Sequence, residues 1–449
     1  MERLPHERWP WLTPVLVAFG LFVAFLANGR MSGAGDTVPA TYLTVALVRG
    51  DGPVLDRFDG LLRESDSRLP GYATDARGHA VSRYPIGPAL VAAPLVAPQV
   101  WWLDATRPGW ERDAVLARLA CERMAKTAAA AIVALTAAVM VLVLRGVGLG
   151  QVAVPAVLVV ALGSDDASTA SQALWQHGPA ELCLALALLL LTKGERRTPA
   201  RLAAAGFVTA LMVVCRPIDL VFAAAVGLWV LAHEDRRERW TFFAPALAVA
   251  AFQCTYNVWF FDTLTGGYAA IEKMHPWAHG TKGTWTAPFF EGAAGTLLSP
   301  SHGLFVYCPW VALALALLPW SVSRIGPAAS LPRWLLWALA VNFVLLSKYS
   351  CWWGGHCFGP RFWIDANPLL ALILAAGLDW TRDRCRPLLA GFALTAAVAV
   401  AFQTVGFLCY PSSWHGSPSN ADRHHERLWD WRDSELTRCW REGIRPRAW

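Results

Sequence analysis

The chain has 449 residues, of which 55% are hydrophobic and 16% charged, and its mean hydropathy is +0.37. Soluble globular proteins carry about 25% charged residues, so this composition excludes an ordinary soluble protein. The net charge of +6 is spread over short loops, and no long basic block indicates nucleic-acid binding. The ten cysteines include no C-x-x-C pair and no zinc spacing, and the 24 tryptophans suit a protein with two membrane interfaces.

Apolar runs of about 20 residues predict membrane-spanning helices. Long runs occupy 11–28, 124–144, 178–192, 217–232, 241–261, 302–320, 332–347 and 388–409, and weaker ones occupy 151–164, 201–215 and 361–379. The pattern predicts an all-α polytopic protein with eleven transmembrane helices. Its transmembrane domain covers 1–409, and 410–449 forms a short external C-terminal tail.

The apolar run 86–103 needs a separate assignment, because three prolines interrupt it and disfavour a regular lipid-exposed helix. Basic residues concentrate in cytoplasmic loops. The short basic loops are 193–201, 236–239, 324–333 and 382–386. If these loops are cytoplasmic and 86–103 does not span, Arg3 and Arg8 also lie inside. We therefore predict a juxtamembrane or re-entrant segment at 86–103 within an external loop, 29–123. The N-terminus is then cytoplasmic and the C-terminus external.

The segment after the first predicted helix contains Gly35-Asp36-Thr37. An acid at the membrane surface beside flexible glycines can act as a general base or bind a cation. Alternatively, Asp36 or Thr37 caps a helix over 39–49, with Pro39 in its first turn. Residue types alone favour the cap, because such caps are common, and both roles are compatible.

Three further external segments carry candidate residues. Arg83 could pair with a phosphate through its planar guanidinium, or it could anchor the following segment at the interface together with Tyr84. Asp165 and Asp166 could supply a second acid near Asp36, or they could form a solvated turn. The remaining candidates, at the same membrane edge, are His177 and Arg216.

Arg216 lies between two apolar runs, where a charge is costly unless it is paired. It is therefore a functional candidate, with snorkelling to headgroups as the alternative. The run from Lys348 to Arg361 contains Trp353 and His356 with paired glycines. It predicts an aromatic, cationic pocket for a sugar face and an anion, or alternatively an aromatic-belt turn.

No nucleotide-hydrolase, serine-hydrolase, zinc-protease or dinucleotide-binding motif is present. The order of several short motifs instead resembles the GT-C membrane glycosyltransferases. The similar relatives are the family 39-like enzymes, including protein O-mannosyltransferases and aminoarabinose transferases, and a subset of bacterial membrane proteins of that type. The motifs are Gly35-Asp36-Thr37-Val38-Pro39-Ala40, Val81-Ser82-Arg83-Tyr84-Pro85, Leu174-Trp175-Gln176-His177-Gly178-Pro179, Ser299-Pro300-Ser301-His302-Gly303-Leu304 and Trp353-Gly354-Gly355-His356-Cys357-Phe358-Gly359-Pro360-Arg361.

The resemblance implies a polyprenyl-phosphate-linked sugar donor, used at the external face of the bacterial inner membrane. It implies Asp36 as the catalytic base, with Asp165 or Asp166 as a second acid. The positions implied for the lipid phosphate are Arg83, Lys348 and Arg361. No cofactor is required, although a divalent cation could bridge Asp36 and Asp166. The acceptor, whether glycan, lipid or protein, is left unassigned.

The expected reaction is a direct displacement that inverts the anomeric centre, with Asp36 deprotonating or orienting an acceptor hydroxyl. A transporter or flippase for a lipid-linked sugar would also need helices and cationic pockets. No internal repeat favours that alternative, and the polar residues cluster at one face rather than at the midplane. An inactive scaffold that binds a lipid-linked glycan is a second alternative.

Overall fold

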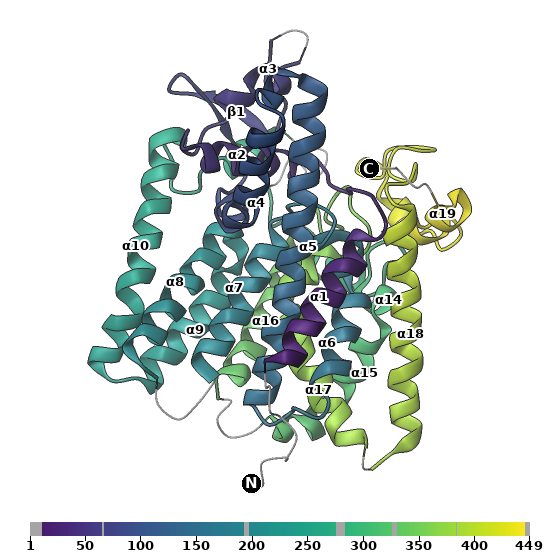
Figure 1. Cartoon of the computed structure of the whole chain (residues 1–449). Coiled ribbons are helices and arrows are strands. Elements are labelled where there is room, and N and C mark those ends of the chain that lie inside the picture. Colours follow the sequence, from purple (N-terminus) through teal and green to yellow (C-terminus); the bar gives the residue numbers. More distant parts are fainter. Residues whose placement is uncertain are drawn as a thin grey trace.

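The two-stranded hairpin in Figure 1 is the one sheet among the described residues, and helices dominate the rest. The computed structural model describes residues 11–64, 67–192, 197–274, 283–325, 330–382 and 384–444. Arg3 and Arg8, and parts of three predicted basic loops, lie outside these ranges. In the hairpin, β1 (Ala73–Ala76) pairs antiparallel with β2 (His79–Ser82). A mainly helical protein is thus confirmed, with one small departure from an all-α fold.

Four described helical segments are long and apolar enough to cross a membrane, judged by length and composition: Ala114–Gly146, Ser330–Lys348, Arg361–Arg382 and Arg386–Cys409. Shorter apolar helices, of 10–17 residues, are Leu12–Leu26, Val38–Arg49, Ala153–Leu162, His177–Thr192, Pro199–Cys215 and Pro217–His233. The described part of the chain therefore shows a helical membrane protein, but the predicted number of eleven spans is not confirmed.

The bundle is built from α1 and α5 to α10, then α15 to α18. Their bounds are α1 Leu12–Leu26, α5 Ala114–Gly146, α6 Ala153–Leu162, α7 His177–Thr192, α8 Pro199–Cys215, α9 Leu220–His233, α10 Arg236–Phe261, α15 Pro309–Ser321, α16 Ser330–Lys348, α17 Asn367–Arg382 and α18 Arg386–Cys409. Predicted span 302–320 is broken, because Pro309 begins a new helix after the single turn α14 (Leu304–Tyr307).

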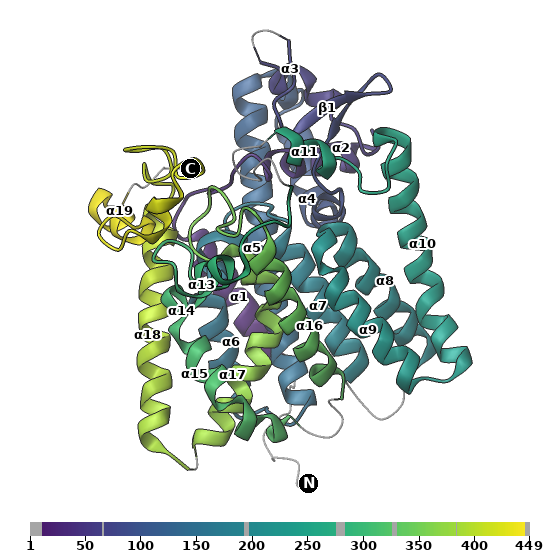
Figure 2. The ribbon, with the colours of Figure 1, turned by 180° about the vertical axis from the view of Figure 1, so that it is seen from behind.

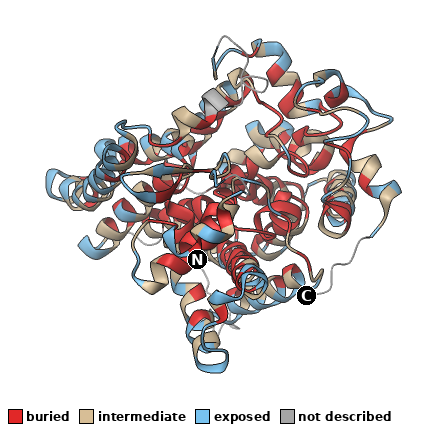
Figure 3. Cartoon of the chain, turned by 90° about the horizontal axis from the view of Figure 1, so that it is seen from above, coloured by how far each residue is buried: buried red, intermediate tan, exposed pale blue. Residues whose placement is uncertain are grey.

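Buried residues gather in the middle of the bundle, and exposed residues lie on the helices at its periphery (Figure 3). Large apolar side chains are exposed on those outer helices, including Phe19, Trp240, Trp337 and Leu394. An apolar surface of this kind is costly in water and natural in lipid. The long helix α5 lies inside the bundle, where its alanine-rich faces pack against α1 and α7.

Elements of the first predicted external loop form a layer on one end of the bundle (Figures 1 and 2). They are α2 (Val38–Arg49), α3 (Asp59–Leu62), the β hairpin and α4 (Gly87–Thr106). The helix α4 is continuous although Pro94 and Pro98 lie inside it, and it packs against α2 and α5. It is not among the candidate spans. Its juxtamembrane placement therefore stays a prediction.

Connections α9–α10 and α17–α18 lie at the opposite end of the bundle from β1 and α2 (Figure 1). On the β1 side lie α11 (Tyr268–Met274), α13 (Phe289–Leu298) and α19 (Glu435–Glu442), shown in Figure 2. Segments far apart in the sequence therefore meet at one end of the bundle. The side of a membrane that this end faces stays a prediction.

The C-terminal segment 410–444 folds back over this same end of the bundle. Arg30, just after α1, donates hydrogen bonds to the backbone carbonyls of Leu408 and Tyr410, and so ties the first loop to the start of this segment. The segment also has a small core of its own. Trp414, Ala421 and Leu428 of the segment form this core together with buried residues of the neighbouring loops. The loop residues are Ala287, Cys351, Trp352 and Trp353.

Candidate functional site

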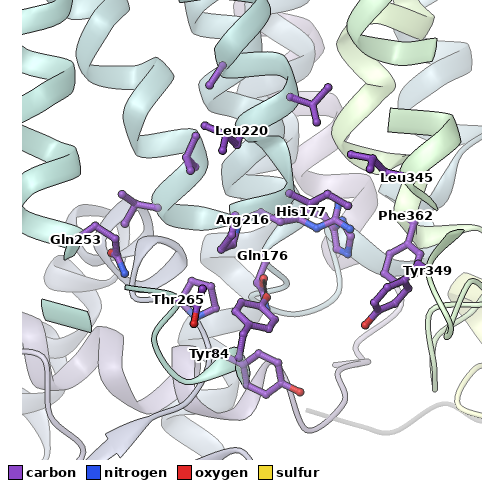
Figure 4. Close-up of a pocket in the computed structure, with 18 of the residues that line it drawn as sticks. Tyr84, Gln176, His177, Arg216, Leu220, Gln253, Thr265, Leu345, Tyr349 and Phe362 are labelled. Atoms are coloured by element: carbon purple, nitrogen blue, oxygen red, sulfur yellow. Dashed lines mark hydrogen bonds between the residues drawn. The ribbon is translucent and has the colours of Figure 1, made fainter. Parts of the chain in front are cut away.

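A large cavity of about 2210 Å³ lies between α8, α9, α10 and α16 and extends to the first-loop layer. In Figure 4, polar side chains from separate segments converge on it, among them Tyr84, Gln176, His177 and Arg216. Leu220 and Leu345 lie on its apolar side in the same view. The cavity therefore has one polar end and one apolar end.

Asp36 and Arg361 form an ion pair at the polar end, although 325 residues separate them in sequence. Arg361 Nη1 donates to Asp36 Oδ2 at 2.7 Å, and both side chains are largely buried. The guanidinium carbon of Arg361 also lies 4.7 Å from the ring centre of Trp175. The second carboxylate oxygen, Asp36 Oδ1, is buried and has no hydrogen-bond partner among the described residues. It is therefore available to accept a hydrogen bond from a ligand.

The helix-cap alternative for Asp36 is wrong. The N-cap position of α2 is occupied by Thr37, and no side chain makes a capping hydrogen bond there. Thr37 instead donates its hydroxyl hydrogen to the carbonyl of Ala34. Pro39 lies in the first turn, as the cap prediction required. The carboxylate of Asp36 is directed to Arg361 and the cavity rather than to the helix.

A second charged cluster lies close by and joins three elements. His177, at the start of α7, has its Nδ1 3.1 Å from Asp365 Oδ1. Arg216, which follows α8, forms an ion pair with the same carboxylate. Phe362 packs beside both, with the guanidinium carbon of Arg216 5.3 Å from its ring centre. The carboxylate of Asp365 thus offsets the charge of Arg216 and orients His177 toward the cavity.

Two close backbone contacts bring the first loop to this cluster. A Cβ at Gly87, the first residue of α4, would lie 2.4 Å from the backbone nitrogen of Cys215. A Cβ at Gly267 would lie 2.4 Å from the carbonyl oxygen of Arg83. Only glycine permits these approaches. As a result, Arg83 and the segment preceding α11 border the same cavity.

Tyrosines complete the polar end. Tyr84 and Tyr268 pack edge to face with ring centres 6.1 Å apart, and the Tyr268 hydroxyl donates to Gln176 Oε1 at 2.5 Å. Burial, with a smaller contribution from Asp36, raises the pKa of Tyr84. Burial likewise raises the pKa of Tyr268 to about 12. Both phenols therefore stay neutral and can donate hydrogen bonds to an anion.

His356 and Asp422 border the outer part of the cavity. His356 Nε2 lies 2.9 Å from Asp422 Oδ2, and the indole nitrogen of Trp353 donates to Asp422 Oδ1 at 2.9 Å. Trp353 itself is buried and does not line the cavity. The structure thus does not place Trp353 in the cavity lining, and its side chain supports Asp422 instead.

The acids Asp165 and Asp166 are buried and do not line the cavity. Asp166 begins a π-helical turn and accepts a hydrogen bond from Asn367 at 2.8 Å. Asp165 accepts from Gln403 at 2.7 Å, and it lies beneath the backbone of Gly359. The structure does not place them with Asp36 at the cavity; each accepts a hydrogen bond inside the bundle, and the second oxygen of Asp165 is buried without a partner among the described residues.

Lys348, at the end of α16, also does not line the cavity, although its neighbours Leu346 and Tyr349 do. A phosphate in the cavity therefore meets arginines rather than Lys348. The two cysteines of this loop, Cys351 and Cys357, are free thiols and do not pair. Of the predicted site residues, the cavity lining contains Asp36, Arg83, Tyr84, His177, Arg216, His356 and Arg361.

Sequence reasoning missed three residues of the site. Asp365 carried a usable signal, because it is an acid inside a predicted span and such residues are costly unless they pair. Tyr268 follows two glycines in a loop, and no pattern in that loop predicts where its side chain points. Asp422 lies in the C-terminal tail, 66 positions after its partner His356 by residue number, and no local pattern connects the two.

No group of three or more His, Cys, Asp or Glu side chains that could hold a metal ion occurs in the part of the chain that the structure describes. Asp36 and Asp166, the residues that a bridging cation would need, border different parts of the protein. Asp36 lines the cavity and Asp166 does not, and a cation held by both residues stays a prediction.

The apolar end of the cavity reaches the lipid-facing surface. Trp337 on α16 lines it and is 77% exposed, and Leu228 and Leu247 on α9 and α10 line it and are more than half exposed. The cavity therefore opens sideways between helices as well as toward the first-loop layer. An extended apolar chain could enter through this opening directly from a bilayer.

Comparisons with known proteins gave a distant structural similarity. No protein-family profile matches the chain, and no curated protein sequence matches it. Among solved structures, it is similar to the oligosaccharyltransferase of Archaeoglobus fulgidus, crystallised with a tethered acceptor peptide that contains the NVT sequon. The identity is 13% and the TM-score 0.48, and the match covers 94% of this chain. The chain matches 59% of that protein's length.

Proposed function

We propose that this protein is a GT-C-type membrane glycosyltransferase. It transfers a sugar from a polyprenyl-phosphate donor to an acceptor at the external face of the bacterial inner membrane. The observation that carries the proposal is the two-part cavity, in which charged residues at one end continue into an apolar groove at the other. A sugar linked through phosphate to a long hydrocarbon chain has the same two-part chemistry.

The apolar groove accommodates the hydrocarbon tail. Each buried methylene contributes about 0.8 kcal/mol, so a chain of several isoprene units binds firmly in such a groove. The guanidiniums of Arg361, Arg216 and Arg83 lie at the polar end, where the phosphate would rest. Arginine suits this task because its planar donors pair with two phosphate oxygens at once.

The proposed step is a single displacement. Asp36 Oδ1 accepts the proton of an acceptor hydroxyl as that oxygen forms a bond to the anomeric carbon. The bond between the anomeric carbon and the phosphate oxygen breaks, and its electron pair stays on the lipid phosphate. Arg361 and Arg216 stabilise that developing charge in a water-poor site. Attack from the face opposite the leaving group inverts the anomeric centre.

Asp36 and Arg361 act together in this scheme. The ion pair fixes the orientation of the carboxylate by holding Oδ2, and it leaves the buried Oδ1 without a hydrogen-bond partner among the described residues. As lipid phosphate accumulates charge, the guanidinium can share its donors between Asp36 and the phosphate. One arginine therefore links the base to the leaving group.

The test uses purified protein in nanodiscs with a panel of fluorescent undecaprenyl-phosphate sugars and candidate glycan, lipid and peptide acceptors, and it measures release of undecaprenyl phosphate. Release is expected with at least one donor, and Arg361→Gln should abolish it. Arg77→Gln, an exposed arginine on the hairpin turn, is the control and should retain activity. Movement of intact lipid-linked sugar across liposomes without any release would instead establish the flippase alternative and overturn the proposal.

A further inference from the structure

The C-terminal segment forms part of the cavity wall. Asn420, Asp422 and Arg423 line the cavity next to Gly355 and His356 of the preceding loop. Buried hydrogen bonds hold the segment against the rest of the protein: Ser299 Oγ donates to the carbonyl of Leu428 at 2.6 Å, and the backbone N–H of Gly359 donates to Glu435 Oε2 at 3.1 Å. Its position against the cavity is therefore fixed by packing rather than by a surface contact alone.

The carboxylate of Asp422 is held on both oxygens and is charged. Trp353 and His356 each donate to one oxygen at 2.9 Å. Burial acts to raise the pKa of Asp422, but the hydrogen bond and charge of His356 and the Trp353 donor outweigh it and lower the pKa to about 2. Each oxygen keeps a further lone pair. The carboxylate can thus accept hydrogen bonds from ligand hydroxyls.

Two glycines place this pair beside the proposed reacting groups. Gly354 and Gly355 have φ values of 81° and 71°, which side chains rarely adopt. A Cβ at Gly354 would lie 3.3 Å from Arg361 Nε, and one at Gly355 would lie 4.0 Å from Arg361 Nη2. The loop therefore passes directly over Arg361, which holds Asp36, and continues to His356.

Aromatic faces border the same part of the cavity. Trp285 and Tyr349 both line it, with ring centres 5.3 Å apart, and Tyr349 packs edge to face against Phe362. Trp285 is 46% exposed. Apolar ring faces beside a carboxylate and an imidazole match a sugar, whose C–H faces are apolar and whose hydroxyls donate hydrogen bonds.

We propose that Asp422 and His356 form the acceptor subsite, which binds the hydroxyl groups of a carbohydrate acceptor and presents one of them to Asp36. The inference rests on the proposed function and adds the class of acceptor to it. Asp422 is a positioning residue in this scheme, since Asp36 takes the proton. The C-terminal segment, which the sequence left without a role, supplies the specificity for the acceptor.

The test compares two ligands on the same full-length protein in nanodiscs. Intrinsic tryptophan fluorescence follows the binding of simple carbohydrate probes, namely methyl hexosides and maltose up to about 100 mM, and Trp353 and Trp285 serve as local reporters. Separate titrations follow the binding of undecaprenyl phosphate. The variant Asp422→Asn keeps the shape of the side chain and an oxygen for the Trp353 hydrogen bond. The matched control is Glu426→Gln, an exposed acid of the same segment.

We expect at least one carbohydrate probe to bind the wild type, and Asp422→Asn and His356→Gln to weaken that binding at least tenfold. Undecaprenyl phosphate should bind all these variants equally. With an active donor, the KM for the acceptor should rise while the KM for the donor stays unchanged. Limited proteolysis of the C-terminal segment checks that Asp422→Asn is folded, and His356→Gln repeats the test if it is not.

The inference is overturned if no carbohydrate probe binds the wild type, or if Asp422→Asn and Glu426→Gln bind the probes equally well. Binding of a serine- or threonine-containing peptide in preference to every carbohydrate would also overturn it. A failure of undecaprenyl phosphate to bind the wild type would instead count against the proposed function. The two failures are therefore distinguishable.

Discussion

Replacing Asp36 by asparagine separates the chemical step from binding. Asparagine has nearly the same shape, and its side-chain oxygen can still accept the hydrogen bond that Arg361 donates at 2.7 Å. The fold around the pair should therefore persist, and Tm should change little. The amide cannot take a proton from an acceptor hydroxyl, so the proposed chemistry loses its base.

The expected loss follows from the role of the carboxylate. A positioned general base contributes about 100- to 10,000-fold to a rate. A loss of that size corresponds to about 2.7–5.4 kcal/mol in activation free energy. Binding of the donor should not weaken, because Arg361 loses its negative partner and its charge becomes more available to the lipid phosphate. The variant should thus lower kcat while leaving the donor KM unchanged or reduced.

The assay measures initial rates of undecaprenyl phosphate release from a fluorescent donor, over a range of donor concentrations, for three proteins. These are wild type, Asp36→Asn and Asp75→Asn. Asp75 lies on the exposed hairpin and pairs with Arg63 at the surface, where such pairs contribute little. A kcat within threefold of wild type for Asp36→Asn would refute the assignment of Asp36 as base. An equal loss of donor binding would show that Asp36 acts in binding instead.

Three further predictions concern the helix bundle and the C-terminal segment. Asp365→Asn leaves Arg216 and His177 without their shared carboxylate. The free energy of unfolding should therefore fall by about 3–5 kcal/mol, which a thermal-shift assay detects as a lower Tm. Ala224→Trp fills the apolar groove and should weaken binding of undecaprenyl phosphate at least tenfold, but not binding of a short-chain prenyl phosphate; equal loss for both would contradict the groove. Burial raises the pKa of Glu435 to about 8, so the folded protein favours the protonated, neutral carboxyl. The stability that this preference provides is fully present below pH 4.5 and is lost as pH rises to about 8. Proteolysis of the C-terminal segment should therefore increase over that range in wild type, and much less in Glu435→Gln.

The helical nature of the elements and their approximate positions were predictable, because long apolar runs dominate the sequence. The prediction failed where local backbone chemistry intervened. Pro309 divides the run 302–320 into two helices, whereas Pro94 and Pro98 leave α4 continuous. Hydropathy reports the polarity of a segment but not how a neighbouring helix compensates for a missing backbone hydrogen bond.

The candidate site was predictable in its residue types and only partly in its geometry. Asp36, Arg216 and Arg361 were identifiable as polar residues at the ends of apolar runs, and Arg216 also because a charge there needs a partner. Their actual partners were not, since Asp365 pairs with Arg216 across 149 positions by residue number and no local pattern encodes such a contact. Asp166 shared the same signal but proved to be a packing residue, because polarity alone does not distinguish a buried network from a cavity wall.

The tie between Arg30 and the carbonyls of Leu408 and Tyr410 has a consequence for biogenesis. During translation, the first loop is made long before the segment that carries Asp422. The part of the cavity wall formed by Asn420, Asp422 and Arg423 is therefore completed only after helices α1 to α18, which precede it in the sequence, have been made. Until residues 420–423 are in place, Asp36 lies beside an incomplete cavity wall.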